Sequence, residues 1–131
     1  MEKIKVLLAD DHTVVRQGLR ALLEAEQDIT IVGEADTGRQ ALRMAQKLSP
    51  DVVVIDVAMP QLNGLEATRQ IMKELPDVRV LVLSSYSDDE YVRQATEAGA
   101  CGYLLKQTAA EDLIRAIREA RSGNAYFSPA I

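Results

Sequence analysis

The sequence has little of what stabilises small secreted proteins or anchors a chain in a membrane. Its 131 residues include one cysteine, Cys101, which has no partner for an intramolecular disulfide and fits a reducing compartment. No apolar run approaches the length that spans a bilayer. The N-terminus reaches the acidic pair Asp10 and Asp11 before the apolar part of a signal peptide could develop. We therefore expect a cytoplasmic chain with no membrane partner.

A surplus of positive charge is also missing. The 15 basic and 20 acidic side chains give a net charge of −5, which argues against direct binding of nucleic acid by this segment. No glycine-rich phosphate loop follows the first apolar run, which disfavours a nucleotide-binding flavodoxin relative. With 47% apolar and 27% charged residues, the composition is typical of one ordinary globular domain.

The sequence does contain a regular alternation of short apolar runs with longer amphipathic stretches. Several of the runs lack the polar alternation of a half-exposed strand, which indicates parallel strands covered on both faces. The predicted strands are residues 6–9, 29–32, 52–55, 80–83 and 102–105. Because parallel strands need right-handed crossovers, these units predict an α/β fold: a doubly wound, five-stranded parallel sheet in the flavodoxin-like order 2-1-3-4-5.

The ends of the predicted helices carry local signals. Capping-box spacing occurs at Thr37 and Gln40, Asn63 and Glu66, Ser87 and Glu90, and Thr108 and Glu111. Gly99 is placed to end the fourth helix. Helical periodicity is lost after residue 121, so we predict a domain over residues 1–121 and the start of a connection over residues 122–131.

Polar side chains follow the predicted strands where these end. Asp10 and Asp11 follow the first strand, Asp56 the third, Ser84 the fourth and Lys106 the fifth. Each residue alone has a structural interpretation, as a helix cap, a turn residue, a loop hydroxyl or a solvated lysine. In an open α/β sheet, however, all of them meet at the functional crevice outside the carboxyl ends of the strands.

Three carboxylates at one sheet edge repel one another, and a hard divalent cation relieves the repulsion. Oxygen ligands with room for water and a phosphate oxygen suit Mg²⁺. Two carboxylates on the metal leave the third free as a nucleophile towards phosphorus. Lys106 would then pair with phosphoryl oxygens and Ser84 would donate a hydrogen bond, which completes the groups needed for an aspartyl-phosphate.

The order and spacing of these motifs resemble the receiver domain of two-component response regulators, over residues 3 to 121. The motifs are Leu8-Ala9-Asp10-Asp11-His12, Val54-Ile55-Asp56-Val57-Ala58-Met59-Pro60, Asn63-Gly64, Leu83-Ser84-Ser85 and Gly102-Tyr103-Leu104-Leu105-Lys106. The resemblance implies a CheY-like (βα)5 fold and a phosphorylation-dependent signalling switch. In this switch Asp56 is the phosphoacceptor and Asp11 the main Mg²⁺ carboxylate, while Asp10 helps through water and Ala58 binds through its backbone carbonyl.

The same resemblance assigns the remaining site residues. It makes Ser84 the switch hydroxyl, Lys106 the phosphoryl-binding amine and Tyr103 the switch aromatic, which turns inward when the hydroxyl moves. Gln61 departs from the family pattern, which often has glycine after Met-Pro. His12 is interpreted as a helix-start residue, because the phosphohistidine of such a system lies on the partner kinase.

Residues 98–106 and 123–130 resemble the NarL/LuxR (FixJ)-type transcriptional regulators, in which a linker and a helix-turn-helix domain follow the receiver. This implies a sensor histidine kinase as partner, a homodimer on phosphorylation, and DNA contact only through a C-terminal domain outside this chain. The chain would be no enzyme beyond its own phosphorylation and autodephosphorylation.

Two alternatives stay open at this point. A haloacid dehalogenase-type phosphatase also uses an aspartyl intermediate, but would want two aspartates one residue apart, whereas Asp10 and Asp11 are adjacent. A receiver-shaped interaction module that is never phosphorylated is the other. The intact set of Asp11, Asp56, Ser84 and Lys106 argues against it.

Overall fold

Strands and helices alternate along the whole chain in this computed structural model, which describes residues 2–129. The elements are β1 (Ile4–Ala9), α1 (Thr13–Glu24), β2 (Ile29–Ala35), α2 (Gly38–Leu48), β3 (Val52–Asp56), α3 (Gly64–Glu74), β4 (Arg79–Ser84), α4 (Asp89–Ala98), β5 (Gly102–Leu105), the 3₁₀ helix η1 (Lys106–Thr108), α5 (Ala109–Arg121) and β6 (Tyr126–Phe127). All strand pairs are parallel, in the order β2-β1-β3-β4-β5-β6. The predicted fold class and the order of the first five strands are confirmed, and a sixth strand extends the sheet beside β5.

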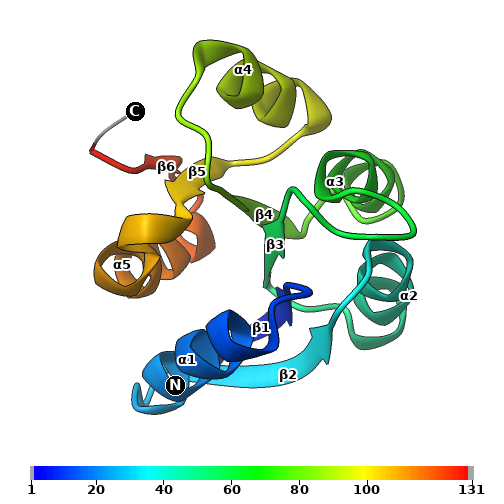
Figure 1. Ribbon diagram of the computed structural model, residues 1–131. Helices are drawn as coiled ribbons and strands as arrows, with labels where there is room; N and C mark the ends of the chain where they lie inside the picture. Colours follow the sequence, from blue (N-terminus) through cyan, green and yellow to red (C-terminus); the bar gives the residue numbers. More distant parts are fainter. Residues whose placement is uncertain (1, 130–131) are drawn as a thin grey trace.

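The sheet separates two apolar cores because successive side chains of a strand point to opposite faces. Val6 and Leu8 of β1 pack on one face with residues of α1 and α5, while Leu7 and Ala9 pack on the other with residues of α2 and α3. Figure 1 shows α1 and α5 on one side of the sheet and α2 and α3 on the other. The apolar runs without polar alternation are therefore explained, since both faces of the central strands are covered.

The segment after α5 returns to the sheet. Tyr126 pairs with Gly102, and the carbonyl of Tyr126 approaches so closely that a Cβ at Gly102 would lie 2.4 Å from its oxygen. Ser128 N–H donates to the Tyr103 carbonyl at 3.0 Å, and the Ser128 hydroxyl accepts from Leu105 N–H at 3.0 Å. Part of the stretch predicted as the start of a connection is thus paired with β5, whose outer edge would otherwise carry unpaired backbone groups. Residues 1, 130 and 131 of the predicted segments lie outside the described residues.

Two of the predicted helix caps form as expected. Thr37 Oγ1 accepts from Gln40 N–H at 3.0 Å, and Asn63 Oδ1 accepts from Glu66 N–H at 2.9 Å. Gly99 ends α4 with a φ of 107°, a left-handed conformation that glycine adopts without strain.

The other two caps differ from the prediction. The prediction for Ser87 is wrong, because Asp88 occupies the cap position of α4 and makes no side-chain cap bond. Acidic residues in the first turn interact with the helix dipole there instead. Thr108 holds the cap position of α5, but its φ of −118° and ψ of 8° lie outside the extended region that capping needs, and its hydroxyl donates to Asp112 at 3.4 Å.

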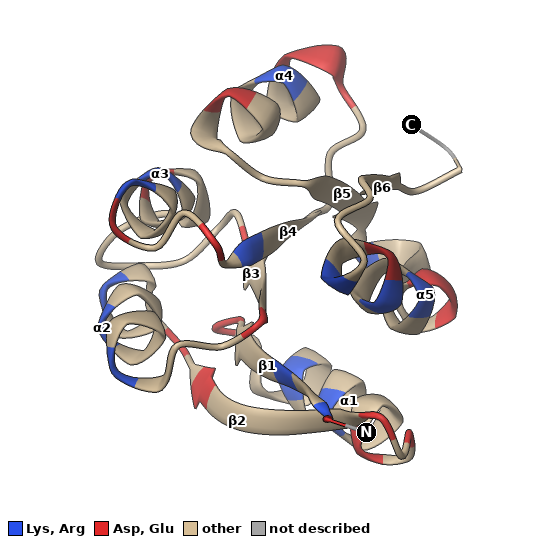
Figure 2. Ribbon diagram, turned by 180° about the vertical axis from the view of Figure 1, so that it is seen from behind, with Lys and Arg blue, Asp and Glu red and all other residues tan. Residues whose placement is uncertain are grey.

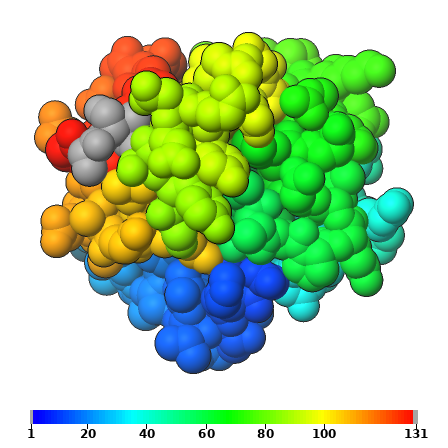
Figure 3. Space-filling view, turned by 45° about the horizontal axis from the view of Figure 1, so that its top comes forward, coloured from blue at the N-terminus to red at the C-terminus, as the bar shows by residue number. Residues whose placement is uncertain are grey.

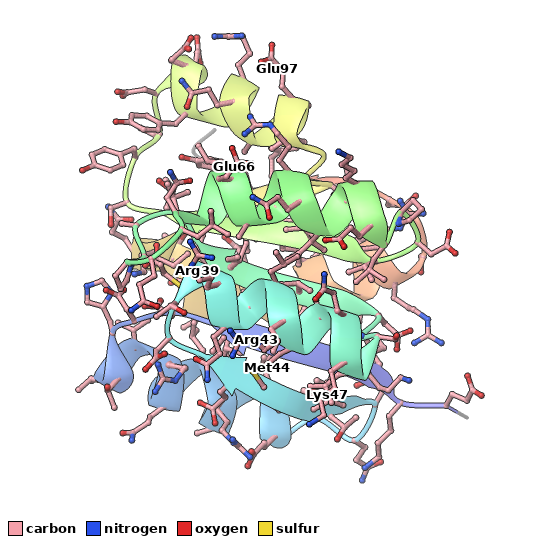
Figure 4. The ribbon with its side chains drawn as sticks, turned by 90° about the vertical axis from the view of Figure 1, so that its right-hand side faces the viewer. Arg39, Arg43, Met44, Lys47, Glu66 and Glu97 are labelled. Carbon is pink, nitrogen blue, oxygen red and sulfur yellow. The ribbon has the colours of Figure 1, made fainter. Side chains whose placement is uncertain are left out.

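Charged side chains are spread over the helices in both signs, except on α2 (Figure 2). The exposed face of α2 carries Arg39, Arg43 and Lys47, whereas Met44 of the same helix packs towards β2, where its methyl carbon would lie 2.5 Å from a Cβ at Gly33 (Figure 4). Among the described residues, none of the helices combines the length and apolar character needed to cross a membrane.

The loop between β3 and α3 is held by a close backbone approach. Gly64 N–H donates to the Val57 carbonyl at 2.8 Å, and a Cβ on Gly64 would lie 2.0 Å from the Asp56 carbonyl oxygen. The loop also holds two side-chain-bearing residues at positive φ, Gln61 at 59° and Leu62 at 129°. Gln61 therefore occupies a backbone conformation that its family counterpart, glycine, adopts without strain.

We expect Gly64→Ala to destabilise the chain by about 2 kcal/mol, because the added methyl forces the Asp56 backbone to move. The matched control is Gly18→Ala in α1, where a Cβ would meet nothing within 4 Å. That change should stabilise the chain by about 0.5–1 kcal/mol through helix propensity. Urea denaturation of both variants measures the difference, and equal effects of the two would contradict the role given to Gly64.

Candidate functional site

The predicted site residues do meet at the carboxyl ends of β1, β3, β4 and β5. Figure 3 shows blue, green and orange parts of the chain, distant in sequence, in contact on one face of the molecule. A pocket of about 100 Å³ opens there, lined by His12, Asp56, Val57, Ala58, Ser84, Ser85, Tyr86 and Lys106. Larger hollows on the surface lie elsewhere and contain none of the predicted site residues.

Acidic side chains dominate this edge of the sheet. Asp10 and Asp56 are almost completely buried, with 0% and 3% of their side chains exposed, and Asp11 is 33% exposed. One ligand atom from each of Asp10, Asp11, Asp56 and His12 can be chosen so that all lie within 4.8 Å of one another. The local cause is the sheet itself, because β1 and β3 are parallel neighbours that end side by side.

Lys106 is the cation that faces this cluster. Its Nζ lies 3.0 Å from Asp56 Oδ2 and 3.2 Å from Asp10 Oδ2. Burial alone would lower the pKa of Lys106, but the hydrogen bond and charge of Asp56 and the charge of Asp10 outweigh it and raise that pKa. Lys106 therefore stays protonated and supplies one positive charge to three carboxylates.

One charge does not satisfy this set of acids. Asp10 Oδ2 is buried and makes no hydrogen bond of good geometry, although Lys106 Nζ is near. Burial raises the pKa of Asp56 and the Asp10 charge raises it further, against the lowering effect of the Lys106 hydrogen bond. A buried carboxylate oxygen without a hydrogen bond, beside two further carboxylates, fits a hard divalent cation. The residues present thus suit the predicted metal.

Ala58 lies directly beside the predicted phosphoacceptor. Its N–H donates to Asp56 Oδ1 at 3.3 Å, which leaves Oδ2 of Asp56 towards Lys106. The role of the Ala58 carbonyl as a metal ligand stays a prediction.

The side chains of Ser84 and Tyr103 are both hydrogen-bonded to the backbone of one residue, Tyr86. The buried Ser84 Oγ accepts from Tyr86 N–H at 3.0 Å, and the Tyr103 hydroxyl donates to the Tyr86 carbonyl at 2.6 Å. Tyr103 is already buried in this structure, and burial raises the pKa of its hydroxyl, which stays protonated as this bond requires. The ring of Tyr86 stacks on Tyr91 of α4, with centroids 4.7 Å apart.

The sequence-based interpretation missed two residues of the site. His12 does hold the cap position of α1, as expected, but its ring also turns into the acidic cluster, with Nδ1 3.0 Å from Asp10 Oδ1. The available signal was its position directly after Asp10 and Asp11 at the end of β1. Tyr86 contributes through its backbone, for which the sequence carries no signal.

A family comparison agrees with this geometry. A profile of the response regulator receiver domain matches residues 6–118. This chain belongs to the response regulator receiver domain family. The predicted resemblance to receiver domains is confirmed, and the haloacid dehalogenase alternative is excluded.

The relatives of this receiver domain are response regulators. The transcriptional regulatory protein LiaR of Bacillus subtilis is 49% identical over 92% of this chain and 57% of its own length. The response regulator protein VraR of Staphylococcus aureus is 41% identical over 98% of this chain and 61% of its own. The solved receiver domain of the putative response regulator NarL from Mycobacterium tuberculosis superposes with a TM-score of 0.90 at 33% identity, covering 95% of this chain and all of that one. This receiver domain therefore spans little more than half the length of the curated relatives it matches.

The raised pKa of Asp56 has a consequence for stability. An acid whose pKa is higher in the folded than in the unfolded state costs stability as the pH rises from its ordinary value of 3.8 through its folded pKa. In metal-free buffer at pH 7, Asp56→Asn should therefore raise the free energy of unfolding, on the order of 1 kcal/mol. The gain should shrink as the pH falls below the folded pKa, and a gain that is equal at pH 3.5 and pH 7 would contradict this account; urea titrations at several pH values measure it.

Proposed function

We propose that this receiver domain is a phosphorylation-dependent switch in which Asp56 accepts a phosphoryl group from a sensor histidine kinase. The observation that carries the proposal is the place of the Asp56 carboxylate. It is almost wholly buried, lines the site pocket, contacts Lys106 at 3.0 Å and shares that lysine with Asp10, whose Oδ2 makes no hydrogen bond of good geometry. A structural aspartate would not need an arrangement that disfavours its own charge.

The transfer is a substitution at phosphorus. An oxygen of Asp56 forms the new O–P bond while the P–N bond of the kinase phosphohistidine breaks, and the departing imidazole takes up a proton. Lys106 then donates hydrogen bonds to phosphoryl oxygens as a point charge. Asp10, Asp11, Asp56 and the Ala58 carbonyl would hold Mg²⁺, which would supply positive charge to the phosphoryl oxygens.

The switch runs through the peptide of Tyr86. A phosphoryl oxygen on Asp56 would accept a hydrogen bond from the Ser84 hydroxyl, which lines the same pocket, and so draw Ser84 Oγ away from Tyr86 N–H. Movement of Ser84 releases Tyr86, and with it the hydrogen-bond acceptor of Tyr103. The surface of α4, β5 and α5 is rearranged as a result. Complete switching from 1:99 to 99:1 requires about 5.5 kcal/mol of differential interaction, which a few charge-assisted hydrogen bonds and a metal can supply.

The outcome is proposed to be dimerisation and control of transcription. The relatives named above are regulators whose chains extend well beyond the matched part. A DNA-binding domain C-terminal to the receiver would contact DNA, since the exposed charge of this chain is negative overall. Apart from its own phosphorylation and autodephosphorylation, the receiver would catalyse no reaction.

Acetyl phosphate with Mg²⁺ should add the mass of one phosphoryl group to the chain, with acetate as the leaving group. Intact-protein mass spectrometry measures the gain, which should vanish in Asp56→Asn and on chelation of Mg²⁺. Asp51→Asn, at an exposed ion pair with Arg121, is the matched control and should retain the gain. A wild-type chain that binds Mg²⁺ but never gains the mass would favour the module that is not phosphorylated.

Tyr103→Phe should separate phosphorylation from its readout. The variant loses only the 2.6 Å hydrogen bond to Tyr86, so phosphoryl uptake should stay at the wild-type level. The link to the α4–β5–α5 surface is weakened, however, and we expect about tenfold weaker dimerisation of the phosphorylated form, equivalent to about 1.4 kcal/mol. Analytical ultracentrifugation with acetyl phosphate tests this, and an unchanged dimer constant would contradict the proposed route.

A further inference from the structure

His12 occupies an unusual place for a helix-start residue. Its backbone holds the cap position of α1, but its side chain makes no capping hydrogen bond, so the ring can make other contacts. The side chain is 57% exposed, yet its polar contacts run through Nδ1 into the acidic cluster. The chain contains one histidine, so no other imidazole competes for this position.

The distances from Nδ1 are those between ligands of one ion. Nδ1 lies 3.0 Å from Asp10 Oδ1, 3.2 Å from Asp11 Oδ1 and 3.8 Å from Asp56 Oδ2. With bonds of about 2.1 Å, neighbouring ligand atoms around an octahedral ion lie about 3.0 Å apart and opposite ones about 4.2 Å. The distances to Asp10 and Asp11 therefore match neighbouring ligands, and the distance to Asp56 lies between the values for neighbouring and opposite ligands.

The contacts of Nδ1 also conflict in their demand for a proton. Lys106 Nζ lies 3.1 Å away, and because an ammonium group only donates, this contact needs a lone pair on Nδ1. Asp10 Oδ1 at 3.0 Å is an acceptor and needs a proton there. A metal ion among the carboxylates would take the Nδ1 lone pair and remove the need for a proton towards Asp10, while Lys106 keeps its ion pairs with Asp56 and Asp10. The Asp10 carboxylate is short of positive charge on its other oxygen too, because the buried Oδ2 makes no hydrogen bond of good geometry and has Lys106 at 3.2 Å as its ion-pair partner.

We propose that His12 Nδ1 is a fourth protein ligand of this site and gives it affinity for imidazole-preferring ions such as Zn²⁺ and Co²⁺ in addition to Mg²⁺. The proposal rests on the metal site of the proposed function and concerns its selectivity. Imidazole nitrogen suits Zn²⁺ and Co²⁺, whereas Mg²⁺ prefers oxygen ligands and keeps several waters. His12 thus distinguishes the two classes of ion, while the carboxylates serve both.

Nitrogen NMR of the single imidazole gives the most direct test. In tag-free, ¹⁵N-labelled protein, equimolar Zn²⁺ should shift the Nδ1 resonance of His12, whereas Mg²⁺ at saturation should leave the ring resonances close to their metal-free positions. A Zn²⁺-induced shift at Nε2 instead of Nδ1, or none at either nitrogen, would overturn the proposal. Cys101→Ser should respond like the wild type, which excludes the thiol as the Zn²⁺ ligand.

Affinities of variants supply the second measurement. By calorimetry, His12→Asn and His12→Ala should bind Zn²⁺ and Co²⁺ about tenfold or more weakly, and Mg²⁺ within about twofold of the wild type. Asp11→Asn should weaken all three ions. If the variants bind Mg²⁺ more tightly and Zn²⁺ unchanged, the ring only competes with the metal, and the proposal is wrong.

The two proposals fail in different ways. A wild-type chain that binds neither Mg²⁺ nor Zn²⁺ removes the metal site of the proposed function. A chain that binds Mg²⁺ and is phosphorylated on Asp56, but whose Zn²⁺ affinity does not depend on His12, removes only the role given to His12. Circular dichroism melts of each variant show that the compared proteins are folded.

Discussion

The repulsion among three carboxylates at one sheet edge is the constraint on which the rest of the structure depends. Asp10 and Asp56 are held there by the ends of buried parallel strands, and their side chains are almost completely inaccessible to solvent. Lys106 balances part of their charge and leaves one Asp10 oxygen without a hydrogen bond. The folded chain thus carries excess negative charge at the place where a cation and a phosphoryl group would bind. This charge lowers the stability of the fold and prepares the site for both ligands.

The features that local patterns determine were predictable from sequence. Apolar runs without alternation indicated buried parallel strands, and Thr37 and Asn63 form the caps that their spacing indicated. The convergence of Asp10, Asp56 and Lys106 followed from one topological rule about parallel sheets. No knowledge of side-chain positions was needed for it.

The features that were not predictable depend on contacts between distant segments. Strand β6 forms because Gly102 allows the Tyr126 carbonyl to approach, a fact that neither segment reveals alone. The start of α4 shifts past Ser87, and the residue directly before Ser87, Tyr86, donates its N–H to the Ser84 hydroxyl. The direction of the His12 ring is set by charges from three strands. In each case a tertiary contact selected among conformations that local sequence allowed equally.

The hydrogen bonds of Ser128 have a mechanical consequence. They fasten the segment that follows α5 to the carbonyl of Tyr103 and to the amide of Leu105, directly before Lys106. Strand β5, which carries Tyr103 and leads to Lys106, therefore also holds the C-terminal segment in place. A displacement of β5 would move the segment after α5 directly through these hydrogen bonds, with no helix in between.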